Sequence, residues 1–124
     1  MKPALRQAFL VHAVVALLLG LGLFLIPATL ASWFNWTPFD PTMARFFGAA
    51  ALGLAASSWL ASHADTIGQV RIVLWLEMVY CILGAVAGLY QLLVGGAPVA
   101  AWVVVVILGG FGAVWVYFYR DARA

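Results

Sequence analysis

Four long apolar segments dominate the sequence and leave very few folds open to it. Each has about twenty residues, which is the length that an α-helix needs to cross the hydrocarbon core of a bilayer. We predict membrane-spanning helices at residues 8–26, 42–61, 70–94 and 99–119. Because a backbone in lipid must satisfy its own hydrogen bonds, the expected fold class is an all-α integral membrane protein.

The composition excludes an ordinary soluble domain. Of the 124 residues, 67% are hydrophobic and 8% are charged. A soluble domain of this size needs a mixed charged surface, which six basic and four acidic residues do not supply. The net charge of +2 is small and its carriers are scattered. We therefore expect the lipid bilayer as a partner and no nucleic acid.

Short turns connect the last three segments. Residues 62–69 form a polar turn, and Gly95-Gly96-Ala97-Pro98 forms a tight reversal. Helices joined this closely are mostly antiparallel neighbours, so we predict a four-transmembrane-helix bundle that is a single domain, 1–124. The first apolar run is longer than the roughly 7–15 residues of a signal-peptide core, which favours a membrane helix.

The basic residues orient this bundle. Four spans place both termini on one side, together with the basic residues Lys2, Arg6, Arg71, Arg120 and Arg123. Arg45 lies near the other side. Because cytoplasmic loops carry the excess of lysine and arginine, we predict that the N- and C-termini are cytoplasmic.

Aromatic residues crowd the segment 27–41 between the first two spans. Trp33 and Trp36 stand there among small polar residues, with a proline at each end. This composition suits the membrane interface, where aromatic rings lie among the headgroups. We expect a short helix near residues 28–34 that lies in the membrane plane. Trp33 and Trp36 then serve either as interfacial anchors or as a lid or partner-docking surface.

The third segment carries an acidic residue inside its apolar run. On a helix that advances about 100° per residue, one face collects the polar and small residues Glu77, Tyr80, Cys81, Gly84, Gly88 and Gln91. We predict that this face packs against protein and that the opposite face contacts lipid. Gly84 and Gly88 are its candidate helix-packing positions.

A second group of small residues lies in the middle of the second segment. Ala49, Gly53 and Ser57 have the small-xxx-small spacing that lets another helix approach closely. Together with the glycines of the third segment, they offer more packing surface than one small bundle needs. This surplus predicts self-association or service as a subunit.

Glu77 and His12 are the candidate intramembrane polar site. Both are expected about 10 Å into the membrane from the cytoplasmic side, by helix rise. A buried carboxylate needs a partner or a proton, so a contact between the two is expected if their helices are neighbours. Two interpretations stay open. The residues form either a protonatable pair for proton-coupled transport or a ligand head, or a structural hydrogen bond that includes Tyr80.

Arg45 lies near the outer end of the second segment, within reach of the headgroups. Asp40, a lipid phosphate or Gln91 is its expected partner. We interpret Arg45 as an interfacial anchor, with substrate binding as the alternative.

Motifs that would indicate an enzyme or a cofactor are absent from the sequence. There is no CxxC, HExxH or GxSxG, and a single histidine in a span excludes haem ligation by two histidines within one chain. Cys81 is interpreted as a small packing residue. His12, Glu77 and Cys81 could in principle hold a metal, but three residues on two helices do not predict one. We therefore predict no metal, no cofactor and no enzymatic activity.

The order of features resembles the DoxX-like class of small bacterial four-helix membrane proteins. The resemblance rests on an apolar first helix that ends at Pro27, on the sequence Ala44-Arg45-Phe46-Phe47-Gly48 before a small-residue second helix, and on a short third turn. It covers nearly the whole chain and implies a bacterial cytoplasmic (inner) membrane location. Small multidrug transporters have a similar length, but their essential carboxylate is in the first helix, where this sequence has His12.

Three functions are consistent with these features. The leading hypothesis is a non-enzymatic scaffold or accessory subunit of a membrane complex, or a homo-oligomer. The second is a small oligomeric proton-coupled transporter or channel that uses Glu77. The third is a lipid- or quinone-like ligand binder with the Trp33–Trp36 segment as its lid.

Overall fold

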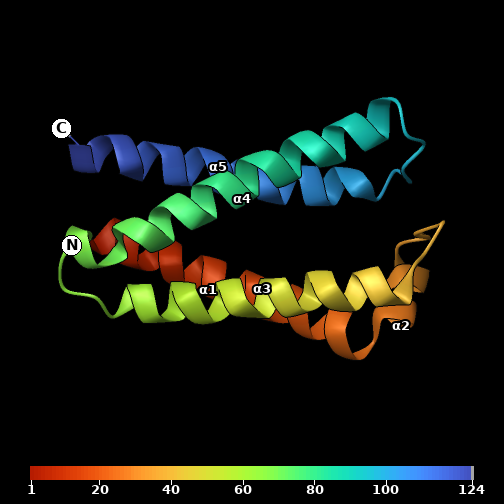
Figure 1. The fold of residues 1–124 in the computed structure, drawn as a ribbon, viewed down its shortest axis with the longest axis horizontal. Helices are drawn as coiled ribbons and strands as arrows, with labels where there is room; N and C mark the ends of the chain where they lie inside the picture. Colours follow the sequence, from red (N-terminus) through yellow and green to blue (C-terminus); the bar gives the residue numbers. More distant parts are fainter. Residues whose placement is uncertain (124) are drawn as a thin grey trace. The chain divides into compact units, whose positions relative to one another are not determined.

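The computed structural model describes residues 1–123, and these form five α-helices and no strand. In chain order the helices are α1 (Pro3–Leu25), α2 (Pro27–Trp33), α3 (Pro41–Ser62), α4 (Ile67–Leu93) and α5 (Ala101–Arg123) (Figure 1). All but the short α2 are long and apolar enough to cross a membrane. The prediction of an all-α fold with four segments that could span a membrane is confirmed.

The helices extend beyond the apolar runs from which they were predicted. α1 begins at Pro3 rather than at residue 8, because proline is pre-organised for the first position of a helix. α5 continues through its polar end to Arg123, whose guanidinium lies 5.7 Å from the centre of the Tyr119 ring one turn earlier. Arg120 and Arg123 in this last turn also suit the negative end of the helix dipole.

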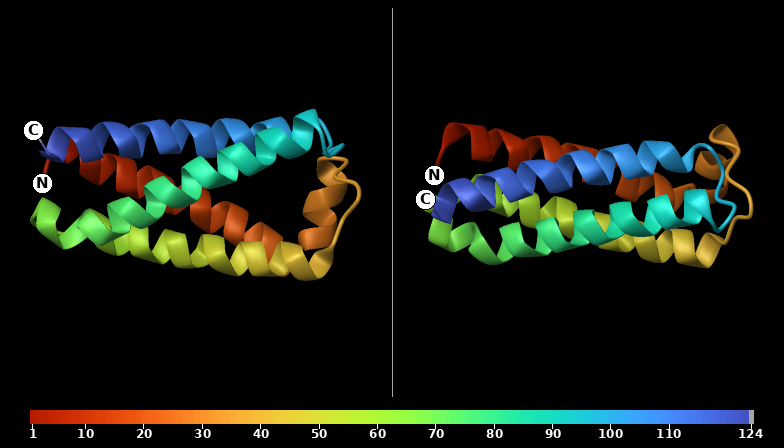
Figure 2. Two further views of the ribbon diagram at one scale, coloured as in Figure 1. Left: turned by 45° about the horizontal axis from the view of Figure 1, so that its top comes forward. Right: turned by 90° about the horizontal axis from the view of Figure 1, so that it is seen from above.

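The chain divides into two compact units, the first from Met1 to Thr66 and the second starting at Ile67. The first unit contains α1, α2 and α3, and the second contains α4 and α5. Each unit is built on one pair of long antiparallel helices (Figures 1 and 2). That the two pairs form one bundle and one domain stays a prediction.

α1 and α3 approach each other so closely that their backbones touch. A Cβ built on Gly48 of α3 would lie 2.7 Å from the backbone nitrogen of Phe24 and 3.0 Å from the carbonyl oxygen of Gly20, both in α1. A Cβ on Gly20 would in turn meet Leu52 at 2.9 Å. Only glycine permits this approach, which is the packing that spanning helices use where burial from water is not available.

The connection between α1 and α3 contains the short helix α2. Pro27 starts α2 directly after α1 ends, which confirms the short helix expected near residues 28–34. The chain then folds back, since the backbone N–H of Trp36 donates to the carbonyl of Ala31. Asp40 ends the connection as the N-cap of α3, and its carboxylate accepts from the N–H groups of Thr42 and Met43.

α4 and α5 meet along a register that runs the length of the pair. Contacts between the two helices pair Trp75 with Tyr119, Cys81 with Gly112, Gly84 with Leu108 and Gly88 with Val105. In these pairs the residue numbers rise along α4 while they fall along α5, as antiparallel packing requires. The predicted reversal at Gly95–Pro98 connects them, and Gly96 adopts a φ of +73° there, which residues with a Cβ rarely adopt.

Candidate functional sites

His12 forms a buried hydrogen-bonded pair with Ser58 inside the first unit. Its Nδ1 atom lies 2.8 Å from the hydroxyl oxygen of Ser58, across the α1–α3 contact. His12 is 4% exposed and Ser58 is fully buried. The pair therefore joins α1 to α3. Because both side chains are buried, water does not compete for the hydrogen bond.

The sequence did not single out Ser58. It pointed to the neighbouring Ser57, whose hydroxyl donates to the carbonyl of Leu54 within α3 itself. The contact that the sequence did predict for His12, with Glu77, stays a prediction because the two residues belong to different units. Ser58 shares one helical face with the buried residues Gly48, Ala51 and Ala55, but the sequence alone does not distinguish this face from the one that contains Ser57.

The polar face of α4 contains its most buried residues. Glu77 and Cys81 are 0% exposed, and Tyr80 is half-buried. Cys81 faces α5, where a Cβ built on Gly112 would lie 3.6 Å from its Cβ atom. Burying an ionisable carboxyl group in a spanning helix costs free energy. This cost marks Glu77 as a candidate for function.

Gly84 and Gly88 lie under side chains of α5. A Cβ on Gly84 would lie 2.7 Å from Leu108, and a Cβ on Gly88 would lie 2.8 Å from Val105. Larger residues at these two positions would have to displace those side chains. The candidate helix-packing glycines of α4 are therefore in contact with α5.

The small residues of α3 that were predicted to pack against another helix lie outside the face that packs against α1. Ala49 and Gly53 are exposed, and a Cβ on Gly53 would meet no atom within 4 Å. Ser57 is half-buried. α1 packs instead on the face that contains Gly48 and Ser58. The Ala49–Gly53 face of α3 is open.

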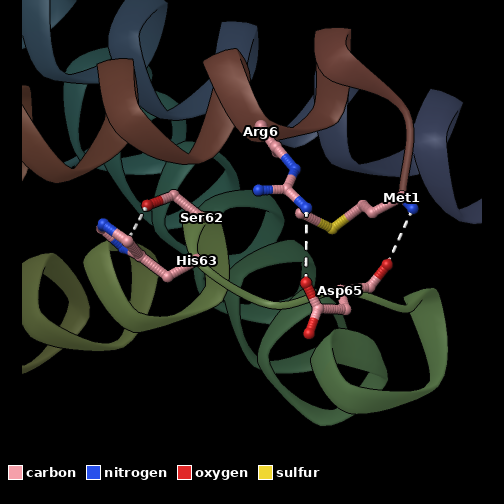
Figure 3. A network of polar contacts seen from close by, with 5 residues as sticks. All are labelled: Met1, Arg6, Ser62, His63 and Asp65. Atoms are coloured by element: carbon pink, nitrogen blue, oxygen red, sulfur yellow. Dashed lines mark hydrogen bonds and ion pairs between the residues drawn. The ribbon is translucent and has the colours of Figure 1, made fainter.

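A polar network joins the start of α1 to the turn after α3 (Figure 3). The guanidinium of Arg6 lies 3.9 Å from the carboxylate of Asp65, and the Met1 ammonium donates to the Asp65 carbonyl at 2.9 Å. At the end of α3, the Ser62 hydroxyl donates to the carbonyl of Trp59, and Nδ1 of His63 lies 2.8 Å from the same oxygen. These contacts, most of them exposed, stabilise the end of the helix pair and do not form a pocket.

Arg45, Trp33 and Trp36 all lie away from these contacts. Arg45 is exposed on the first turn of α3, and Trp33, at the end of α2, is 67% exposed. Trp36 is half-buried. The exposed indole fits both interpretations given above, an interfacial anchor and a lid, so both stay predictions.

Comparison of the chain with protein-family models, with curated protein sequences and with solved structures found no match.

Proposed function

We propose that this protein is a scaffold or accessory subunit of a membrane complex, or a homo-oligomer, that associates through the open face of α3. The observation that carries the proposal is Gly53, a glycine in the middle of a spanning helix with open space around its α-carbon. Glycine weakens a helix relative to alanine by about 1 kcal/mol. The close approach of another helix, which a glycine permits, would offset this loss at Gly53.

The residues around Gly53 give this face a saddle shape. Phe46 and Leu60 lie seven residues before and after it, so all three fall on one line along the helix. Phe46 is 66% exposed and Leu60 is 71% exposed. Between these two large side chains the surface is formed by small exposed residues, namely Ala49, Ala50, Gly53 and Ala56. A partner helix would cross at the small residues and pack against the large ones.

Helix association in lipid favours such a surface. Apolar burial supplies no driving force there, so spanning helices associate through close packing of small residues and through hydrogen bonds between helices. The hydrogen-bonding residues of the first unit, His12 and Ser58, already join α1 to α3. The small-residue face of α3 is the surface that remains for an external helix.

We also propose a location, an orientation and a family for the protein. We place it in the bacterial inner membrane as a four-helix bundle with cytoplasmic termini, and we retain the DoxX-like class as its proposed family. The basic residues near the chain ends support the orientation, and the Ala44–Gly48 sequence supports the class.

Substitution of Gly53 tests the proposal. Gly53→Ile fills the saddle, whereas Gly110→Ile places the same side chain at a glycine of α5 that also has no neighbour within 4 Å. Native mass spectrometry of complexes released from membranes reports copy number and partners together. We expect the wild type and Gly110→Ile to retain a second subunit and Gly53→Ile to lose it. A wild-type protein that is strictly monomeric and carries no other protein would contradict the proposal.

A transporter that uses Glu77 is the second candidate, because this carboxyl group is completely buried in a spanning helix. Glu77→Gln, studied beside the same variants, separates the two functions. A scaffold with this substitution keeps its partners. A proton-coupled transporter loses proton flux in liposomes while its assembly is unchanged.

A further inference from the structure

An open groove runs along the second unit, on a face formed by α4 and α5. It has a volume of about 760 Å³. The side chains that line it from α4 are Ile82, Ala85 and Val86, and small residues of α5 form much of the remainder. One end reaches Gly109 in the middle of α5, and the other end reaches Arg120 and Asp121 in its last turns.

We propose that this groove binds one phospholipid with a phosphoethanolamine headgroup, with one of its two acyl chains along the apolar part and its headgroup on Arg120 and Asp121. This binding site is independent of the association surface on α3. It would hold a lipid whether or not the chain assembles with other subunits.

The length of the groove fits one acyl chain in one leaflet. From Gly109 to Arg120 the groove follows α5 for eleven residues, or about 16 Å at the helical rise. Half of the hydrocarbon core of a bilayer is about 15 Å thick. A chain that starts at the charged end of the groove therefore reaches the bilayer centre where the groove ends.

The lining of the groove changes from apolar to charged along its length, as a phospholipid changes from acyl chain to headgroup. Ala85, Gly109 and Ala113 leave a shallow apolar floor, and Tyr117 stands near the charged end, 63% exposed. Tyrosine is enriched at the level of the headgroups, where its ring is in apolar surroundings and its hydroxyl is in polar ones. Basic residues between spanning helices on the cytoplasmic side bind lipid headgroups.

The two charges at the end of the groove select the headgroup. Arg120 can hold a phosphate through charge-assisted hydrogen bonds, and Asp121 can accept from a primary ammonium. A carboxylate has about four lone-pair positions, so Asp121 can share the ammonium with its other contacts. An anionic headgroup without an amine offers no cation to Asp121. A choline headgroup has no N–H to donate.

A helix of a second copy fits the groove less well than a lipid does. The apolar middle of such a helix would cover Arg120 and remove its charge from water, which is costly. A phospholipid supplies the opposite charge at both Arg120 and Asp121.

Lipid retention by the full-length protein tests the proposal. The purified protein is exchanged into an equimolar mixture of phosphatidylethanolamine, phosphatidylglycerol and phosphatidylcholine, and bound lipid is identified by native mass spectrometry. We expect one phosphatidylethanolamine per chain, about tenfold above either competitor. Equal retention of the three lipids would overturn the proposal.

Charge variants with a matched control locate the headgroup. Arg120→Gln should lower phospholipid retention about tenfold, whereas Arg123→Gln should not change it, because Arg123 does not line the groove and lies over the Tyr119 ring. Asp121→Asn should remove the preference for phosphatidylethanolamine over phosphatidylglycerol without removing binding. Equal effects of the two arginine substitutions would indicate general attraction to lipid and would overturn the site.

Glycine variants locate the acyl chain. Gly109→Leu places a side chain in the groove, and Gly110→Leu places the same side chain on the adjacent residue, which has no neighbour within 4 Å and does not line the groove. Retention should fall for Gly109→Leu alone, with both variants equally helical by circular dichroism. If Gly109→Leu instead changes the subunit count and leaves lipid retention unchanged, the groove is a protein interface and the proposal is wrong.

Discussion

At the scale of single residues, two adjacent serines of α3 have different roles. Ser58 is fully buried and bonded to His12 of α1, whereas Ser57 donates to a carbonyl of its own helix. Both serines are small and polar, and both follow small residues in the sequence of α3. The direction of each side chain, which depends on where α1 lies, decides which one joins the helices.

Ser58→Ala should destabilise the first unit, because it leaves the buried imidazole of His12 without this bond. Hydrogen bonds between spanning helices contribute about 0.6 kcal/mol on average and about 1.7 kcal/mol at most. We expect a loss within that range in the free energy of unfolding, measured by denaturation in mixed detergent micelles. Ser57→Ala is the control and should change the free energy by less. Equal losses for the two variants would show that the bond to His12 contributes nothing.

At the scale of the helix, α3 uses glycine for two purposes. Gly48 allows backbone contact with α1, and Gly53 faces open space on another side of the same helix. Helix propensity disfavours both positions equally, so propensity alone cannot distinguish them. The distinction comes from the neighbouring helix.

Gly48→Ala and Gly53→Ala should therefore change stability in opposite directions. The new methyl group at Gly48 would lie 2.7 Å from a backbone nitrogen of α1 that cannot move independently, and overpacking of this kind costs about 1–3 kcal/mol. The methyl group at Gly53 meets nothing and raises helix propensity by up to about 1 kcal/mol. Denaturation of the two variants in detergent measures both changes. A stable Gly48→Ala would refute the close α1–α3 contact.

Sequence reasoning predicted the helices far better than their faces. Hydropathy located all four apolar helices. Hydropathy could not predict which stripe of α3 meets α1, because both stripes combine alanine, glycine and serine with large apolar residues. In lipid, apolar periodicity is weak, since the surface of a spanning helix is as apolar as its interior contacts. The glycines of α4 were easier to interpret, because Glu77 and Cys81 already marked a face.

At the scale of the whole molecule, the orientation in the membrane can be measured with cysteine labels. Cys81 is the only cysteine of the chain and is buried, so Cys81→Ser gives a background without thiols. A thiol reagent that cannot cross membranes should label Val99→Cys, in the exposed α4–α5 connection, in intact cells. Thr66→Cys, before α4, should be labelled only after permeabilisation. The reverse pattern would place the termini outside.

The division into two helix pairs has a consequence for how the protein is made. The contacts that hold α1, α2 and α3 together lie within the first 66 residues, so all the residues that form them are synthesised before those of α4 and α5. Chains fold domain by domain from the N-terminus during synthesis. The first pair can therefore close in the membrane while the ribosome is still producing the second. In this order of assembly, the tight backbone contact at Gly48 forms early, when no later helix competes for it.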